Sequence, residues 1–266
     1  DLKNFLNDLK KFVVYYKMSE KYTDQEDFLI RHKTIPEKEW THTALGLPPD
    51  SYPGSYYIDD KELTLFHNLY NIHTFGEHKP IHLTEKHKEF SPVLIDLDLR
   101  HNFSNSKKRH YDELFIKTII TMYFKEILKY IPNINKDYLK AFVLEKDTPN
   151  FNTNKSFYKD GIHVVLPFIV TDPRIQYLIR YNILNDPNTK TLFESIHTIN
   201  PLDDVIDIAV IEKNNWQMYG SCKPNYDTYK LSRIYDYIEE TNLKKIDNNY
   251  STLELLKILS IRKNKE

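Results

Sequence analysis

The chain has 266 residues, a formal net charge of −1 at pH 7 and one cysteine, Cys222. These values exclude a disulfide framework, a Cys-rich zinc site and a globally basic surface, so a polyanion must bind at a local patch. The sequence has no apolar run of membrane-spanning length and no signal peptide, and we expect a reducing compartment and no membrane partner. Because it starts without Met, we expect it to be a domain of a longer protein.

The first part of the chain alternates between helical and irregular patterns. Apolar residues at helical spacing predict a helix over 2–17, and four prolines favour irregular structure over 18–60. Residues 61–75 have a helical pattern. The apolar, β-favouring run Ser91–Arg100 predicts a buried strand that Pro92 opens.

The second part interleaves helices with short strands, which favours the α+β class. We predict helices over 111–130 and 172–184 and from Asp186, strands over 140–145 and 161–169, and a polar loop over 148–160. Two further strands, 205–211 and 216–219, are predicted to form a hairpin across Asn214-Asn215. Ser251 and Glu254 predict a capping box before a last helix.

Two carboxylates, Asp96 and Asp98, interrupt the strand at 91–100. Because strand side chains alternate, both point to one face, while Ile95, Leu97 and Leu99 point to the other. Two close carboxylates require a compensating cation, and oxygen ligands suit Mg²⁺ or Mn²⁺. The alternative is a strand end with both side chains in water.

Two other predicted strands repeat this pattern. His163 and Asp207 each lie on a polar face opposite buried aliphatic residues, although a lone residue at such a place is more often structural. Three carboxylates on one sheet surface, Asp96, Asp98 and Asp207, fit a two-metal phosphoryl-transfer centre.

Cationic side chains near the predicted strands provide phosphate ligands. Lys159 and His163 come from one strand, and Lys213 and Lys223 flank the predicted hairpin. For the lysines, a solvated surface charge is the alternative. The run Lys107-Lys108-Arg109 is either a template contact or a solvated loop. Seven of the eleven histidines lie between 67 and 110, but their spacing lacks a helical frame, so zinc is not favoured.

The order and spacing of these groups resemble the three motifs of archaeo-eukaryotic primases (AEPs). The motifs correspond to Asp96-Leu-Asp98, Lys159-x-Gly161-x-His163 and Val205-Ile-Asp207. The stretch after Asp207 resembles the primase-polymerase branch, in which an aromatic-x-x-Tyr strand ends in Ser and Lys, here Ser221 and Lys223. The stretch 82–96 looks closest to the primase-helicases of large nucleocytoplasmic DNA viruses. The resemblance covers roughly residues 80–230.

The resemblance implies an AEP fold, with an RNA-recognition-like antiparallel sheet carrying the carboxylates and a smaller α/β part, over 1–266. It implies that Asp96, Asp98 and Asp207 are catalytic and bind two Mg²⁺ or Mn²⁺ ions. It also implies nucleotide-binding roles, which we assign to Lys159, Gly161, His163, Lys213, Ser221 and Lys223. Gly161 stands where the family usually has Ser, and a backbone N–H could replace that hydroxyl. Gln217 stands where relatives often have Arg.

The sequence therefore predicts a DNA primase or primase-polymerase that joins NTPs or dNTPs on a single-stranded DNA template. Aromatic stacking should hold the template. No ATPase motif is present, so a helicase would lie outside these residues. If the protein is viral, it would act in the host cytoplasm or nucleus. The alternatives are a metal-dependent nuclease with the same carboxylates and a non-catalytic nucleic-acid-binding module.

Overall fold

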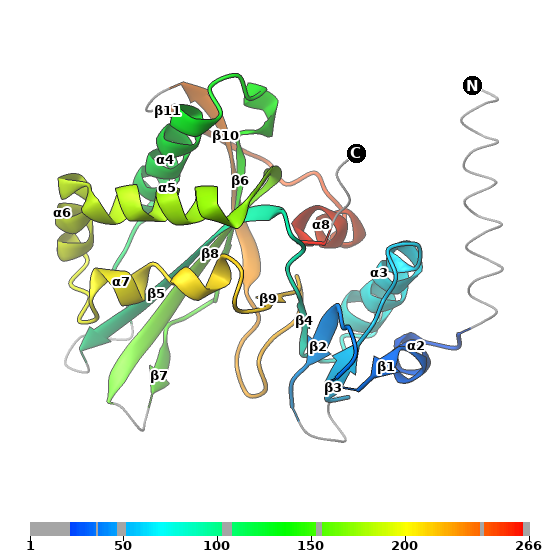
Figure 1. Ribbon diagram of the computed structural model, residues 1–266. Coiled ribbons are helices and arrows are strands. Elements are labelled where there is room, and N and C mark those ends of the chain that lie inside the picture. Colours follow the sequence, from blue (N-terminus) through cyan, green and yellow to red (C-terminus); the bar gives the residue numbers. More distant parts are fainter. Residues whose placement is uncertain are drawn as a thin grey trace.

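The computed structural model describes residues 22–35, 37–46, 52–102, 108–152, 156–239 and 242–262. Within them, the strands form two antiparallel sheets, a larger one and a smaller one, with helices packed around both (Figure 1). The predicted α+β class with antiparallel sheet is therefore confirmed. The predicted helix over 2–17 lies outside the described residues.

The large sheet has six strands in the order β11-β10-β6-β8-β5, with β7 paired to β8. Its strands are β5 (Ser91–Asn102), β6 (Lys140–Glu145), β7 (Asn150–Asn152), β8 (Phe157–Thr171), β10 (Lys230–Glu239) and β11 (Asn242–Ile246). The predicted strand over 140–145 is confirmed. The predicted loop over 148–160 is wrong in part, because β7 and the start of β8 pair there.

The small sheet has the order β1-β3-β2-β4-β9. Its strands are β1 (Lys33–Thr34), β2 (His42–Ala44), β3 (Gly54–Tyr56), β4 (Leu83–Glu85) and β9 (Trp216–Gln217). Helices α2 (Gln25–Arg31) and α3 (Leu63–Asn71) pack on this sheet, and a π-helical turn, Ile72–Gly76, continues α3. The prediction of irregular structure over 18–60 is therefore wrong for α2 and β1 to β3, whose short segments carry little periodic signal.

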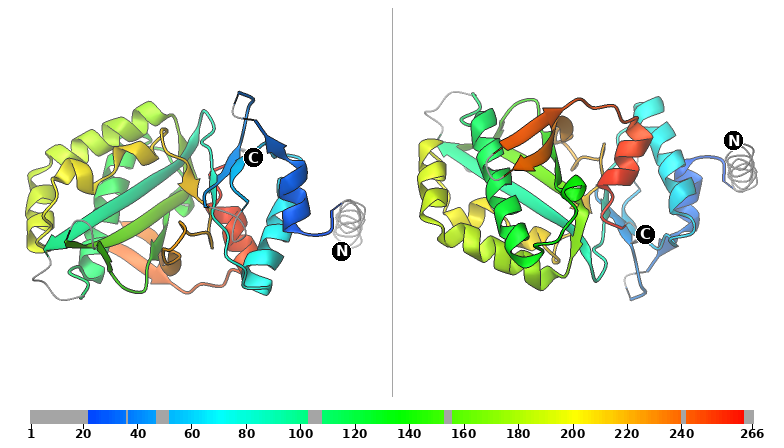
Figure 2. Two further views of the ribbon diagram at one scale, coloured as in Figure 1. Left: turned by 90° about the horizontal axis from the view of Figure 1, so that it is seen from below. Right: turned by 90° about the horizontal axis from the view of Figure 1, so that it is seen from above.

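One face of the large sheet is covered by a layer of helices (Figure 2). These are α4 (Glu113–Tyr130), α5 (Pro173–Asn185), α6 (Pro187–Ser195) and the short α7 (Leu202–Val205), with a 3₁₀ turn, Lys136–Tyr138, after α4. They bury the side of β5 that carries Ile95, Leu97 and Leu99. Asp112, Asp172 and Asp186 cap α4, α5 and α6 through their carboxylates, as the sequence predicts for the last two.

The other face of the large sheet is covered only in part, by α8 (Thr252–Leu259). Leu255 and Leu259 pack on the large sheet, whereas Leu256 joins the core of the small sheet. Ser251 and Glu254 form the predicted capping box of α8. Helix α8 thus joins the two sheets and leaves part of this sheet face open.

The predicted hairpin of strands 205–211 and 216–219 is wrong. Residues 202–205 form α7, Ile208–Val210 form a 3₁₀ turn, and β9 pairs with β4. Only Ile206 pairs with the large sheet, as an isolated bridge to Leu97. Val205, Ile206, Val210 and Ile211 are buried without a strand ladder, and Ile208 is exposed.

Candidate active site

Asp96 and Asp98 lie on the face of β5 that α8 covers in part. Leu94, on the same face, packs in the core beneath α8. Two and four residues further along the strand, the same face carries Asp96 and Asp98, which line an open cavity. The alternation predicted from the sequence is therefore confirmed for this strand.

The neighbouring strand β8 places polar groups directly opposite these carboxylates. Asp96 pairs with His163, and Asp98 pairs with Gly161. His163 Nε2 lies 3.5 Å from Asp96 Oδ1, and Lys159 Nζ lies 2.8 Å from Asp98 Oδ1. The four polar side chains therefore form one cluster across the two strands.

The segment after α7 brings Asp207 beside Asp96, although Asp207 is not on a strand. Its backbone N–H donates to the carbonyl of Asp96 at 3.0 Å, and its Oδ1 accepts from the N–H of Ala209 at 2.8 Å. Arg180, which is buried, donates to the carbonyl of Ile206 at 2.8 Å and anchors the segment. The third predicted carboxylate is therefore a neighbour of the first two.

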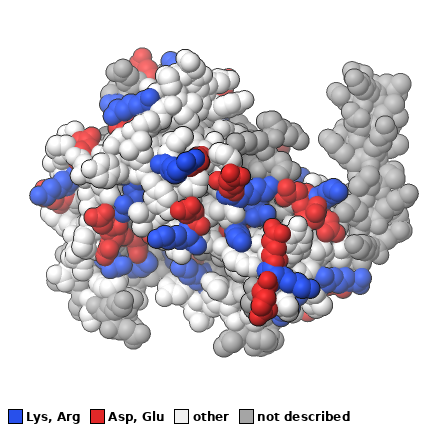
Figure 3. All heavy atoms as spheres, viewed as in Figure 1, with Lys and Arg blue, Asp and Glu red and all other residues white. Residues whose placement is uncertain are grey.

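A cavity of about 420 Å³ lies over this part of the sheet. Its lining includes Asp96, Asp98, Lys159, Gly161, His163, Asp207 and Lys223, together with Lys146, Phe151, Tyr226 and Tyr229. Most of the predicted site residues are thus brought together. On the face of the molecule in Figure 3, basic and acidic side chains are interspersed, so charge is not segregated on that face.

Two predicted site residues, Lys213 and Ser221, are absent from the cavity lining, and Gln217 and Gly161, which do line it, have polar groups engaged within the protein. Lys213 is exposed and is absent from the residues that line the cavity. The hydroxyl of Ser221 is buried and donates to the carbonyl of Ile81 at 3.2 Å. Gln217 lines the cavity, but its side-chain amide donates to the carbonyl of Ser221. The N–H of Gly161 donates to Asp160 Oδ1 at 3.0 Å.

The carboxylates and the lysines of the cavity shift the pKa values of Asp96 and His163 in opposite directions. Burial, with the negative charges of Asp98 and Asp207, raises the pKa of Asp96 to about 7. Burial, with the positive charges of Lys146, Lys223 and Lys159, lowers the pKa of His163 to about 3. His163 is therefore a neutral imidazole at pH 7, and Asp96 has more negative charge around it than the lysines compensate.

Residues 41–235, more than half of the chain, match the family model described as the C962R protein N-terminal AEP domain. The chain belongs to this family. The resemblance to archaeo-eukaryotic primases is thereby confirmed.

Two viral proteins are similar to this AEP domain. One is "Putative helicase L207/L206" of Acanthamoeba polyphaga mimivirus, 32% identical over 235 residues, which cover 83% of this chain and 24% of that protein. The other is "Putative helicase 184R" of Invertebrate iridescent virus 6, 25% identical over 225 residues, which cover 76% of this chain and 22% of that protein. The AEP domain thus spans about a quarter of the length of these relatives. No described helix is long and apolar enough to cross a bilayer.

The carboxylates of the AEP domain have the donor chemistry of a Mg²⁺ or Mn²⁺ site, and the pKa of Asp96 is raised by burial and by the negative charges of Asp98 and Asp207. Among the described residues, however, no group of three or more His, Cys, Asp and Glu side chains is arranged to hold a metal ion. Lys159 is paired with Asp98, and Asp207 caps the turn at Ala209.

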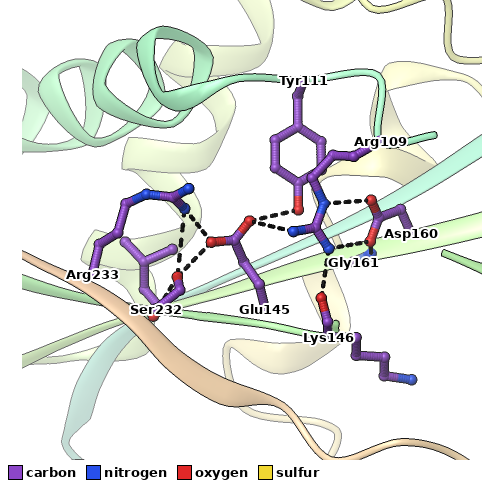
Figure 4. A network of polar contacts seen from close by, with 9 residues as sticks. Arg109, Tyr111, Glu145, Lys146, Asp160, Gly161, Ser232 and Arg233 are labelled. Carbon is purple, nitrogen blue, oxygen red and sulfur yellow. Dashed lines mark hydrogen bonds and ion pairs between the residues drawn. The ribbon is translucent and has the colours of Figure 1, made fainter. Parts of the chain in front are cut away.

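A partly buried polar network beside the cavity joins β6, β8 and β10 of the AEP domain (Figure 4). Arg109 donates to Asp160 Oδ2 at 3.0 Å, to Glu145 Oε1 at 3.1 Å and to the carbonyl of Lys146 at 2.6 Å. Tyr111, Ser232 and Arg233 also donate to Glu145. Arg109 is therefore neither a template contact nor part of a solvated loop, because it forms ion pairs within the protein. Lys108 is exposed, and Lys107 lies outside the described residues.

Sequence reasoning missed Lys146 and Tyr229. The Tyr229 ring stacks on the imidazole of His163, with ring centroids 3.6 Å apart and planes 18° apart. Lys146 follows directly after β6, a strand that the sequence predicted, so a polar residue at that strand end was the available signal. Tyr229 precedes β10, which had no sequence prediction.

Proposed function

We propose that this AEP domain is the nucleotidyl-transferase part of a DNA primase or primase-polymerase. It would join NTPs or dNTPs on a single-stranded DNA template and release pyrophosphate. The observation that carries the proposal is the meeting of Asp96, Asp98 and Asp207 in one cavity, beside lysines and a neutral histidine. The large sheet would then correspond to the RNA-recognition-like sheet of the primase fold.

In this proposal, the carboxylates and the cationic residues of the cavity have different tasks. Asp96, Asp98 and Asp207 would hold two divalent cations, which would supply charge neutralisation and activation of the attacking hydroxyl. Lys159 and Lys223 contact phosphate oxygens as cations, and His163 contacts them as a neutral donor. Lys213 and Ser221 do not fit this role, because the first lies outside the cavity lining and the second is engaged with Ile81.

The rim of the cavity favours a single-stranded template. Phe151 and Tyr226 line it and are exposed by 38% and 52%. Exposed rings in the lining of a cavity that also carries lysines are suited to stacking with unpaired bases. The names of the viral relatives support a further part of the proposal, that the domain belongs to a longer primase-helicase acting in an infected host cell.

A primer-synthesis assay tests the function. The protein is incubated with single-stranded DNA and labelled ATP or dATP, each with Mg²⁺ and with Mn²⁺. We expect extended products that are lost in Asp96→Asn and Asp98→Asn and retained in Asp172→Asn, a matched change at the cap of α5. Shortened DNA would indicate a nuclease instead. DNA binding without incorporation under any condition would indicate a non-catalytic module.

A further inference from the structure

Lys146 is a half-buried cation without an ionic partner in the described part of the chain. It lines the cavity, and no carboxylate of the described residues lies within ion-pair distance of its ammonium, whereas Lys159 has Asp98. Burial and the positive charges of Lys159 and Lys223 lower its pKa. An anion that enters the cavity would stabilise this partly desolvated ammonium by pairing with it.

Two tyrosine rings hold the ammonium in place. Lys146 Nζ lies 4.9 Å from the ring centroid of Tyr229 and 5.1 Å from that of Tyr226. At the other end of the residue, the carbonyl of Lys146 accepts from Arg109, and the side chain extends away from the polar network (Figure 4). The backbone and the ammonium of Lys146 are therefore both fixed.

Tyr229 connects Lys146 to the strand that carries His163. Its ring stacks on His163, and its hydroxyl lies over Gly161, only 2.2 Å from where a Cβ would be. The Tyr229 hydroxyl thus occupies the space that a side chain at position 161 would fill. Lys146, Tyr229 and His163 form one stack along the cavity wall.

We propose that Lys146 binds the triphosphate of the incoming nucleotide, together with Lys159 and Lys223, and that Tyr229 is the residue that positions it. The inference rests on the proposed nucleotidyl transfer and adds a contact outside the three sequence motifs. Three ammonium groups that line one cavity match a polyanion that brings several phosphate oxygens at once. A carboxylate-bound cation and a lysine-bound triphosphate would then lie next to each other in the same cavity.

The experiment measures binding of inorganic tripolyphosphate by calorimetry and the KM for ATP in primer synthesis. The variants are Lys146→Met, Lys146→Arg and, as a matched control, Lys125→Met. Lys125 is exposed on α4, which covers the opposite face of the sheet. We expect Lys146→Met to weaken binding and raise KM by roughly tenfold or more, because a charge-assisted hydrogen bond is lost. Lys146→Arg should restore part of this, and Lys125→Met should change nothing.

Tyr229 variants test the positioning role. Tyr229→Phe keeps the ring beneath the ammonium and should keep tripolyphosphate affinity, whereas Tyr229→Leu removes the ring and should weaken binding as Lys146→Met does. Equal weakening by both, or by neither, would overturn the role of the ring.

The outcomes separate the inference from the proposed function. Wild-type tripolyphosphate affinity and KM in a folded Lys146→Met protein would overturn the inference and leave primer synthesis intact. The same result follows if Lys125→Met weakens binding equally, because the effect would then be general charge screening. If the wild type makes no primers but binds tripolyphosphate through Lys146, the proposed function fails and the polyphosphate site stands.

Discussion

Replacing Gly161 with Ala tests the close contact between β8 and Tyr229. A Cβ at position 161 would lie 2.2 Å from the Tyr229 hydroxyl oxygen and 3.2 Å from Cζ of the same ring. The ring has little freedom to retreat, because it stacks on His163 and carries Lys146. Overpacking of this kind costs about 1–3 kcal/mol, and we expect Gly161→Ala to reduce the free energy of unfolding by that amount.

Tyr229→Phe should relieve most of this cost. Removing the hydroxyl leaves Cζ as the nearest atom, at 3.2 Å, so the ring needs to move by only a few tenths of an ångström. We expect Gly161→Ala to cost less than about 1 kcal/mol in the Tyr229→Phe background. The two substitutions should therefore show a favourable coupling on the order of 1 kcal/mol.

Urea denaturation of the four proteins in the double-mutant cycle measures this coupling. Gly76→Ala is the control, because a Cβ there meets no atom within 4 Å, and its effect should add to that of Tyr229→Phe. Additive effects of Gly161→Ala and Tyr229→Phe would refute the proposed close contact.

Three further predictions concern charged groups. Without metal, the folded protein favours the protonated form of Asp96, because the pKa of this group is raised. The stabilisation that results is complete below about pH 4 and is lost as the pH rises through 7. The unfolding free energy of Asp96→Asn should thus exceed that of the wild type increasingly with pH, by up to ~4 kcal/mol, and a constant gap from pH 5 to 8 would contradict this. Arg109→Met removes the ion-pair partner of buried Asp160 and one of the two partners of buried Glu145 and should cost about 3–5 kcal/mol in urea denaturation, whereas Arg174→Met, at an exposed pair, should change the unfolding free energy little. Glu85→Ala removes the fully buried acceptor of Ser260 and Ile261, and limited proteolysis should show earlier cleavage after α8; unchanged cleavage would argue against that tether.

The sequence predicted the strands whose local pattern decides their structure. In β5, the alternation of Asp96 and Asp98 with aliphatic residues assigns both the strand and its two faces. The same reasoning failed for Asp207. The β-branched run around it favours a strand by propensity, but tertiary packing forms α7 and a 3₁₀ turn there, and Asp207 becomes the N-cap of that turn. The residue was found, but its backbone conformation was not.

The site residues that were missed depend on contacts between distant segments. Tyr229 matters because its ring meets His163 and its hydroxyl meets Gly161, and neither contact has a local sequence signal. Arg109 belongs to a basic run of the kind that is usually a solvated loop. In the structure it instead forms ion pairs with the buried carboxylates of Glu145 and Asp160. Residue type could suggest chemistry for these positions, but only the packing of β6, β8 and the segment before β10 assigns their partners.

The hydrogen bond from the N–H of Asp207 to the carbonyl of Asp96 joins two distant chain segments through main-chain atoms alone. Exchange of the Asp96 side chain therefore leaves this link between the two segments in place, whereas exchange of Asp207 also removes the cap of the turn at Ala209. Loss of activity in an Asp96 variant would report the missing oxygen atom and not a displaced loop.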